Sequence, residues 1–245
     1  MEILTNNQKH DTITDDASSV ANSFQVTDIK QAVKNPNRAN IFIDGKYSFS
    51  LDITQLVDAK LKIGATLTAE RLDELKHASA FGKLYQRTLE WVLARPRSVK
   101  ETRDYLSRKV KENLKSSFEE HKTWPSGPER LEKESFQVLD ILVAKGYLDD
   151  RKFAEYYVEN RFVKKGISTK RLKMELKKKG VSSQIIDEVL SQNTRTDEQE
   201  IQKIIAKKRA KYDDIKLIQY LARQGFDFEL ARNLVRESSE TDSQN

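Results

Sequence analysis

The stretch STKRLKMELKKKGVSSQIIDEVL, residues 168–190, decides the fold because a matching stretch, DDIKLIQYLARQGFDFELARNLV, follows at residues 213–235. The two stretches align with Gly180 opposite Gly225, an offset of 45 residues. An earlier, degenerate copy begins at Ser98 and lies farther away, with Leu106 opposite Leu176, so it must contain an insertion. A fixed period of this length indicates a stacked helical unit, and about three copies begin to bury a continuous core. Such a repeat favours a binding surface over a catalytic pocket.

The spacing of apolar residues around these copies predicts three modules of three short helices each. In each quoted copy the middle helix and the third helix are joined by a tight glycine turn, a geometry that resembles helix-turn-helix units. We expect module 1 at residues 68–148, with an inserted loop at 111–130. Module 2 is expected at 149–193 and module 3 at 194–237.

Short polar residues at the expected helix starts predict N-caps. Ser98 and Glu101 have the spacing of a capping box, in which the serine hydroxyl and the glutamate side chain satisfy each other's free backbone amides. Ser168 is expected to cap the middle helix of module 2, and Ser182 or Ser183 the helix after it. The acidic pairs Asp149-Asp150 and Asp213-Asp214 are interpreted as caps rather than as ligands of a divalent metal.

The chain before the modules has a different pattern. β-rich runs flank Asp44-Gly45, and this dipeptide is a strong signal for a two-residue hairpin turn. With a short helix at 54–60, this pattern predicts a small β-rich domain at residues 23–67. Residues 1–22 and 238–245 are expected to be disordered tails.

Composition limits the class of protein. Apolar residues make up 37% and charged residues 33% of the chain. This balance favours an elongated, surface-rich helical protein. Cysteine is absent, which excludes disulfides and thiolate metal sites and favours an intracellular location. The N-terminus lacks the features of a secretory signal, and no apolar run reaches the roughly 20 residues that span a bilayer. We expect a soluble, cytoplasmic protein that does not bind membranes.

Positive charge is concentrated on the helices of modules 1 and 2. Residues 161–179 hold nine basic residues and one acidic residue, and residues 83–111 hold nine basic and three acidic ones. Module 3 is nearly balanced. Concentrated positive charge on repeated helices predicts contact with a polyanion or an acidic protein face. A solvated helical surface is the alternative interpretation.

Catalytic motifs are missing from the sequence. The three histidines, at positions 10, 77 and 121, have no partner at metal or triad spacing. Gly45-Lys46 and Gly82-Lys83 lack both the earlier glycine and the following hydroxyl of a phosphate-binding loop. The sequence therefore predicts neither an enzyme nor a cofactor.

Motifs in a fixed order, over about 150 residues, resemble the RecX family of recombinase regulators. The resemblance extends from Ala80 to Arg236, and the β-rich domain resembles the N-terminal extension of the longer family members. The motifs are Arg95-Pro96-Arg97-Ser98 with Glu101, Arg103 and Tyr105-Leu106; GYLDDRKFA at 146–154; Lys165-Gly166; and ELKKKGV at 175–181. The chain departs from the family pattern at its 111–130 loop.

The resemblance implies tandem three-helix repeats that bind the RecA recombinase filament, lie along its groove and limit its assembly or activity. It implies a non-enzymatic role in regulating bacterial DNA repair, homologous recombination and the SOS response. The fold expected is mainly α, an elongated curved rod of three-helix modules after a small β-rich domain. The partners expected are the RecA filament and DNA, contacted directly or within the filament, and we expect a monomer.

Eight basic residues are the predicted partner-binding residues, on the hypothesis that they line the inner face of the repeats. Two alternatives remain open: an autonomous DNA-binding repeat protein that acts on duplex, or a helical scaffold for an unrelated protein partner. The eight residues are Arg97, Arg103, Arg161, Lys164, Lys165, Lys170, Arg171 and Lys173.

Overall fold

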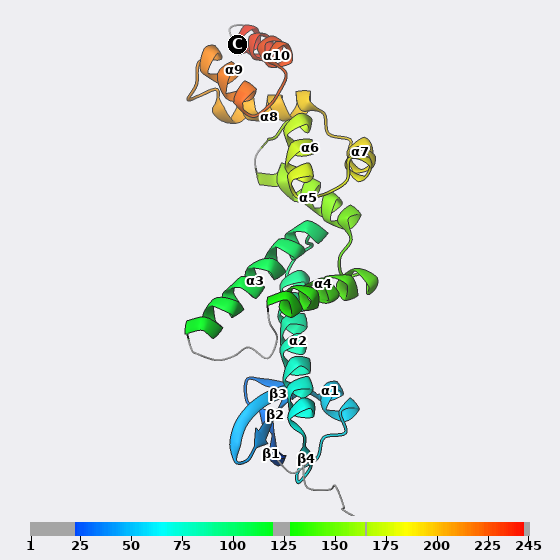
Figure 1. The fold of residues 1–245 in the computed structure, drawn as a ribbon. Helices are drawn as coiled ribbons and strands as arrows, with labels where there is room; N and C mark the ends of the chain where they lie inside the picture. Colours follow the sequence, from blue (N-terminus) through cyan, green and yellow to red (C-terminus); the bar gives the residue numbers. More distant parts are fainter. Residues whose placement is uncertain (1–22, 120–127, 165, 243–245) are drawn as a thin grey trace, which may run out of the picture. The chain divides into compact units, whose positions relative to one another are not determined.

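The computed structural model describes residues 23–119, 128–164 and 166–242, and the chain divides into two compact units between Gly82 and Lys83. The predicted N-terminal tail, residues 1–22, lies outside the described residues. The described fold is mainly helical with a small N-terminal sheet, as the sequence predicts (Figure 1). The residue at which the units divide lies inside a single helix, α2 (Ala69–Leu93).

The first unit is an antiparallel sheet in the order β3-β2-β1-β4. Its strands have the bounds β1 (Phe24–Ala32), β2 (Asn35–Ile43), β3 (Lys46–Asp52) and β4 (Thr66–Leu67).

The predicted hairpin turn between β2 and β3 is confirmed. Asp44 has a φ of 49° and Gly45 a φ of 77°. Left-handed backbone at both positions is what a type I′ turn requires. The two strands pair directly from Ile43 and Lys46 onward, with one irregularity between Ile41 and Phe42. The turn therefore sets the register of the sheet.

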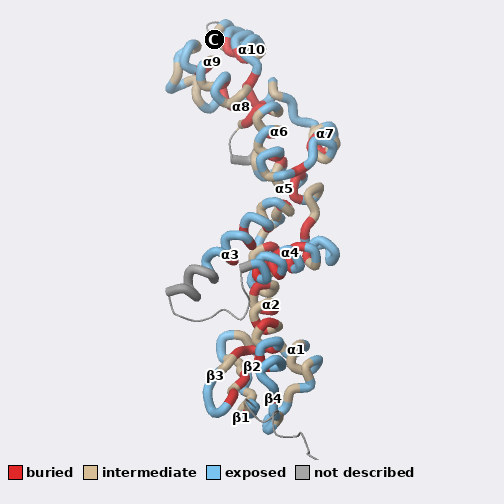
Figure 2. The backbone as a smooth tube through the Cα atoms, viewed as in Figure 1, coloured by how far each residue is buried: buried red, intermediate tan, exposed pale blue. Residues whose placement is uncertain are grey.

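The core of the first unit lies between the sheet and the start of α2. Val26, Ile41 and Leu51 are fully buried, and Leu72 and Leu75 of α2 pack against them. Figure 2 shows this burial as red segments of the strands and of α2. Alternating buried residues on the strands and i, i+3 spacing on the helix bring these apolar faces together.

Helix α1 (Ile53–Asp58) lies between β3 and β4 in the chain and contacts α2 through Gln55. It starts one residue before the predicted range because Asp52 caps it and Gln55 completes a capping box. The Gln55 amide also donates to the carbonyl oxygen of Ala78 in α2, at 2.7 Å. Gly82 of α2 leaves room for this glutamine, since a Cβ there would lie 2.8 Å from its amide group.

The second unit is helical throughout its described elements. After the rest of α2 its helices are α3 (Val99–Glu119), α4 (Pro128–Ala144), α5 (Asp150–Lys164), α6 (Thr169–Lys178), α7 (Ser183–Ser191), α8 (Asp197–Lys208), α9 (Asp214–Arg223) and α10 (Phe228–Asp242).

Two predicted irregular segments are wrong. The loop expected at 111–130 is helical up to Glu119 and again from Pro128, and residues 120–127 lie outside the described residues. The tail expected from residue 238 continues α10 to Asp242, where Val235 is fully buried and anchors the preceding turn. In α10 polar residues extend a helix that apolar residues have already started, because propagation is easier than nucleation. In α3 the extension also holds Leu114 and Phe118, which continue among its polar residues.

The 45-residue offset between the quoted copies is confirmed in three dimensions. Leu172 and Leu176 of α6 are fully buried in one core, and Leu217 and Leu221 of α9 are fully buried in the other. The first core is completed by α5 and α7, and the second by α8 and α10.

Each copy ends its middle helix with the same backbone motif. Gly180 has a φ of +85° and Gly225 a φ of +88°. The amide of the residue after each glycine bonds back to the carbonyl of Leu176 or Leu221, at 3.2 Å in both. This is a Schellman motif, and its left-handed residue is the reason that glycine occupies both positions.

Most predicted caps are confirmed, and one is only half right. Ser182 caps α7, and the carboxylate of Asp149 accepts from the amides that begin α5. The Ser98 hydroxyl accepts from the Glu101 amide at 3.0 Å, as the capping box requires. The Glu101 carboxylate, however, binds the Lys179 ammonium at 2.6 Å, because a charged partner is within reach.

Candidate partner-binding surface

Helix α6 carries five basic residues and one acidic residue, Glu175. Ser168 caps its first turn, accepting from the Arg171 amide, and Leu172 and Leu176 fix its buried side. Lys170 is exposed on the opposite side. Lys177 and Lys178 are also exposed, in the last turn, where cations offset the helix dipole.

Arg161 holds α5 and α6 together. Its guanidinium makes two bonds to the Glu175 carboxylate, Nε to Oε2 at 2.8 Å and Nη2 to Oε1 at 3.0 Å. The Tyr157 hydroxyl donates to the same carboxylate at 2.8 Å. The hydrogen bonds from Arg161 and Tyr157 lower the pKa of Glu175 to about 2, although partial burial opposes the shift. Arg161 is therefore committed to contacts within its own module.

Arg171 is also committed, on the other side of α6. Its Nη1 donates to the backbone carbonyl of Arg223 and to the side-chain oxygen of Gln224, at 3.2 Å each. Its Nε lies 3.5 Å from Glu175. These contacts join α6 to the end of α9, so a large part of this guanidinium is directed at protein atoms.

Lys173 makes a weaker, exposed contact. Its ammonium lies 2.7 Å from the carboxylate of Asp187 on α7, and both side chains are well exposed. Exposed ion pairs of this kind contribute about 0–1 kcal/mol, so a polyanion could displace Asp187 at little cost. Lys173 remains available for binding.

Arg97 belongs to a stack of aromatic rings in module 1. Its guanidinium carbon lies 3.9 Å from the centre of the Trp91 ring, and Trp91 stacks on Tyr105 with ring centres 4.4 Å apart. The Arg97 Nε is buried without a hydrogen-bond partner, and burial lowers the pKa of the guanidinium. Because both faces of Trp91 are covered, this stack leaves no free platform for a nucleobase.

Arg103 on α3 and Lys170 on α6 differ from the arginines in internal contacts. Both side chains are exposed, and no described residue pairs with either of them. The Lys164 side chain and the whole of Lys165 lie outside the described residues. Of the eight predicted residues, the structure thus leaves Arg103 and Lys170 exposed and unpaired, Lys173 exposed and weakly paired, and Arg97, Arg161 and Arg171 in internal contacts.

The sequence interpretation missed the partners of these arginines. Glu175 stands 14 residues from Arg161 and Gln224 stands 53 residues from Arg171, and neither spacing carries a recognisable signal. It also did not include Lys177 and Lys178 among the predicted partner-binding residues, although both belong to the same basic run and are exposed.

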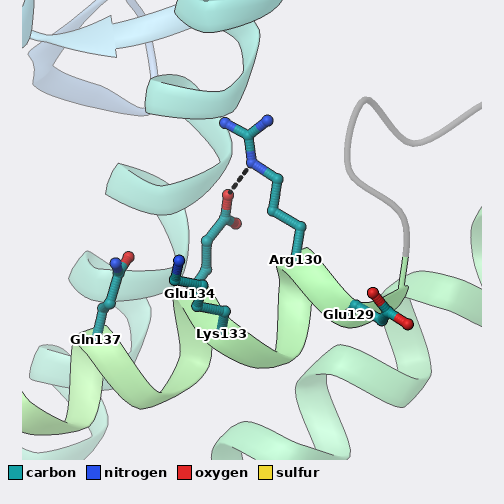
Figure 3. A pocket seen from close by; sticks show the side chains of 5 residues that line it. All are labelled: Glu129, Arg130, Lys133, Glu134 and Gln137. Atoms are coloured by element: carbon teal, nitrogen blue, oxygen red, sulfur yellow. Dashed lines mark ion pairs between the residues drawn. The ribbon is translucent and has the colours of Figure 1, made fainter.

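Figure 3 shows a pocket whose described lining residues all lie on α4: Glu129, Arg130, Lys133, Glu134 and Gln137. Its one drawn contact is the ion pair of Arg130 and Glu134, at 3.6 Å. The described residues hold no cluster of metal-ligating side chains. None of the described helices is both long and apolar enough to cross a lipid bilayer.

Repeated three-helix units with basic helices define a tandem helical-repeat protein. Family comparison narrows this class. Residues 149–190 match the family described as "RecX, second three-helix domain", and residues 24–68 match "Regulatory protein RecX N-terminal domain".

Curated relatives agree. The "Regulatory protein RecX" of Bacillus licheniformis is 30% identical over 221 residues, which cover 87% of this chain and 77% of that protein. The protein of the same name from Listeria monocytogenes serovar 1/2a is 30% identical over 224 residues, covering 88% and 76%. The chain belongs to the RecX family of regulatory proteins.

A structure described as "Crystal structure of regulatory protein RecX" has the same fold. It superposes with a TM-score of 0.59 at 21% sequence identity, covering 87% of this chain and 99% of that one.

Proposed function

We propose that this chain is a non-enzymatic regulator that binds the RecA recombinase filament along its groove and inhibits its recombinase and ATPase activity. Membership of the RecX family supports a regulatory role. The finer proposal adds a partner, and the observation that carries it is the set of exposed, unpaired cations on α3 and α6.

These cations suit a partner that presents phosphates or carboxylates at intervals. Arg103, Lys170, Lys177 and Lys178 are exposed, and no hydrogen bond or ion pair joins any of them to another described residue. A recombinase filament carries DNA phosphates and acidic protein side chains, and both attract such cations. The arginines in internal contacts keep the helices in place and are not expected to bind the partner directly.

The proposal predicts a salt-dependent affinity. Each cation that neutralises a phosphate releases condensed counterions, so the logarithm of the binding constant falls with that of the salt concentration by roughly 0.7–0.9 per contact. The slope would count the contacts with DNA in the filament. Contacts with acidic protein side chains would weaken with salt less steeply.

A charge-reversal pair tests the assignment. Lys170→Glu with Lys177→Glu should lower affinity for a RecA filament at least tenfold and raise the concentration needed to inhibit the recombinase ATPase. Both side chains are exposed, so helix content should not change. The matched control is Lys207→Glu with Lys211→Glu, which makes the same change in charge at exposed positions of module 3.

Each outcome has a clear meaning. Equal inhibition by both double variants and by the unaltered protein would refute the assignment of the site. If the unaltered protein binds duplex DNA in the absence of recombinase, the chain is an autonomous DNA-binding protein. If it binds neither DNA nor filament, it is a scaffold for another partner.

A further inference from the structure

Consecutive modules of the second unit are connected by the same hydrogen bond at two places. The hydroxyl of Ser98, at the start of α3, donates to the carbonyl of Lys179 at 2.7 Å. The hydroxyl of Ser168, at the start of α6, donates to the carbonyl of Gln224 at 3.1 Å. Lys179 and Gln224 are the C-cap residues of α6 and α9. At each of these two places, called a joint below, the start of one module's middle helix therefore contacts the end of the middle helix of the next module.

A second bond repeats beside the first. The amide of Val99 donates to the carboxylate of Asp150 at 2.9 Å, and the amide of Thr169 donates to that of Asp197 at 2.9 Å. Asp150 and Asp197 are the first residues of α5 and α8. Each aspartate thus satisfies a free amide at the start of a helix that belongs to the preceding module.

The turn glycines complete both joints. A Cβ on Gly180 would lie 2.6 Å from the Cβ of Lys100, and a Cβ on Gly225 would lie 2.8 Å from the Ser168 hydroxyl. Gly146 has the same left-handed backbone, yet a Cβ there would meet nothing within 4 Å. Gly180 and Gly225 therefore permit a close approach between modules, as well as a turn.

The joint needs a side chain that accepts and donates at once. The Ser98 hydroxyl accepts from the Glu101 amide at 3.0 Å and Ser168 accepts from the Arg171 amide at 3.2 Å, while each hydroxyl also donates across the joint. A carboxylate can accept but not donate. Module 3 has Asp213 at the corresponding position, where it accepts from the Lys216 amide at 2.8 Å.

We infer that Ser98 and Ser168 are positioning residues that couple each module to the next, and that a carboxylate at this position, as at Asp213, could cap the helix but could not donate the bond across the joint. The coupling holds α3 relative to α6 and α6 relative to α9. If the proposed function is correct, it also sets the spacing at which Arg103 and Lys170 meet the filament.

The decisive variant is Ser168→Asp. Aspartate keeps the cap of α6, as Asp213 shows for α9, but it cannot donate to Gln224 and places a negative charge beside that carbonyl. The chain has no cysteine, so pairs of introduced cysteines can carry spin labels without interference. One pair, Glu159→Cys with Asn233→Cys, spans modules 2 and 3 at exposed positions. A second pair, Gln219→Cys with Asn233→Cys, lies within module 3.

We expect Ser168→Asp to broaden or shift the distance distribution of the first pair, measured by pulsed electron paramagnetic resonance, and to leave the second pair and the helix content unchanged. Asp213→Ser is the matched control, and both distributions should stay as they are. An unchanged first distribution in the Ser168→Asp variant would overturn the inference.

Recombinase inhibition is read separately with the same variants. A broadened distribution accompanied by at least a fivefold loss of inhibition supports the coupling and its use in binding. A broadened distribution with full inhibition refutes only the link to the filament. Failure of the unaltered protein to inhibit the recombinase refutes the proposed function. The coupling between modules is then judged by the distance measurements alone.

Discussion

Alanine substitutions at two turn glycines should distinguish the energetic cost of a left-handed turn from the energetic cost of a close contact between modules. Gly146 and Gly180 both end helices with left-handed backbone, at φ values of +74° and +85°. That conformation costs an alanine about 1 kcal/mol in either place. At Gly180 the new methyl group would also lie 2.6 Å from the Cβ of Lys100. Overpacking of this kind typically costs about 1–3 kcal/mol.

We therefore expect Gly146→Ala to lower the free energy of unfolding by about 1 kcal/mol and Gly180→Ala by about 2–4 kcal/mol. The measurement is urea denaturation followed by far-ultraviolet circular dichroism. The two variants should be compared at equal slope, so that a change in midpoint reports stability. Equal midpoints would show that the close approach of Gly180 to α3 does not constrain the folded protein, and would refute the packing argument.

Three further predictions concern single side chains. The pKa of Glu175 is about 2 in the folded protein, below its ordinary 4.5. The stabilisation that the ionised carboxylate gives the folded state is therefore complete above about pH 5 and is lost as the pH falls towards 2. Glu175→Gln should remove about 1–3 kcal/mol at neutral pH, after allowance for solvent screening, and flatten the acid dependence of thermal unfolding. Asp149→Ala should cost about 1 kcal/mol by removing the cap of α5, and Asp149→Ser should restore it, both by urea denaturation. Gly45→Ala should destabilise the sheet of the first unit by about 1 kcal/mol, seen as faster amide exchange in β2 and β3 and not in α9.

Local patterns predict a large part of this fold. Buried leucines at 172 and 176, the caps at Ser168 and Ser182, and the Asp44-Gly45 turn all depend on residues a few positions apart. Such short-range rules hold here because each helix is started by its own cap and oriented by its own apolar residues. The predictions fail where segments rich in polar residues continue a helix, as in α3 and α10.

The candidate site was less predictable, because a count of charges does not reveal their partners. Arg161 and Lys170 look alike in the sequence, yet one is held by Glu175 and the other is exposed. Whether a cation is free depends on carboxylates and carbonyls that only tertiary packing brings near. Ser98 and Ser168 did carry a signal: each is a serine cap, and an aspartate begins the first helix of the module after each.

The packing of α2 on the sheet determines where an N-terminal fragment can end. The family match to the N-terminal region covers residues 24–68, but Leu72 and Leu75, both buried against the sheet, lie beyond it. A fragment cut at residue 68 would therefore expose the underside of its own sheet, and would be prone to self-association. The compact unit extends to Gly82. A fragment that ends at Gly82 therefore keeps Leu72 and Leu75 of α2, and also the contact of Gln55 with Ala78. The boundary of the homologous sequence and the boundary of the folding unit are different residues.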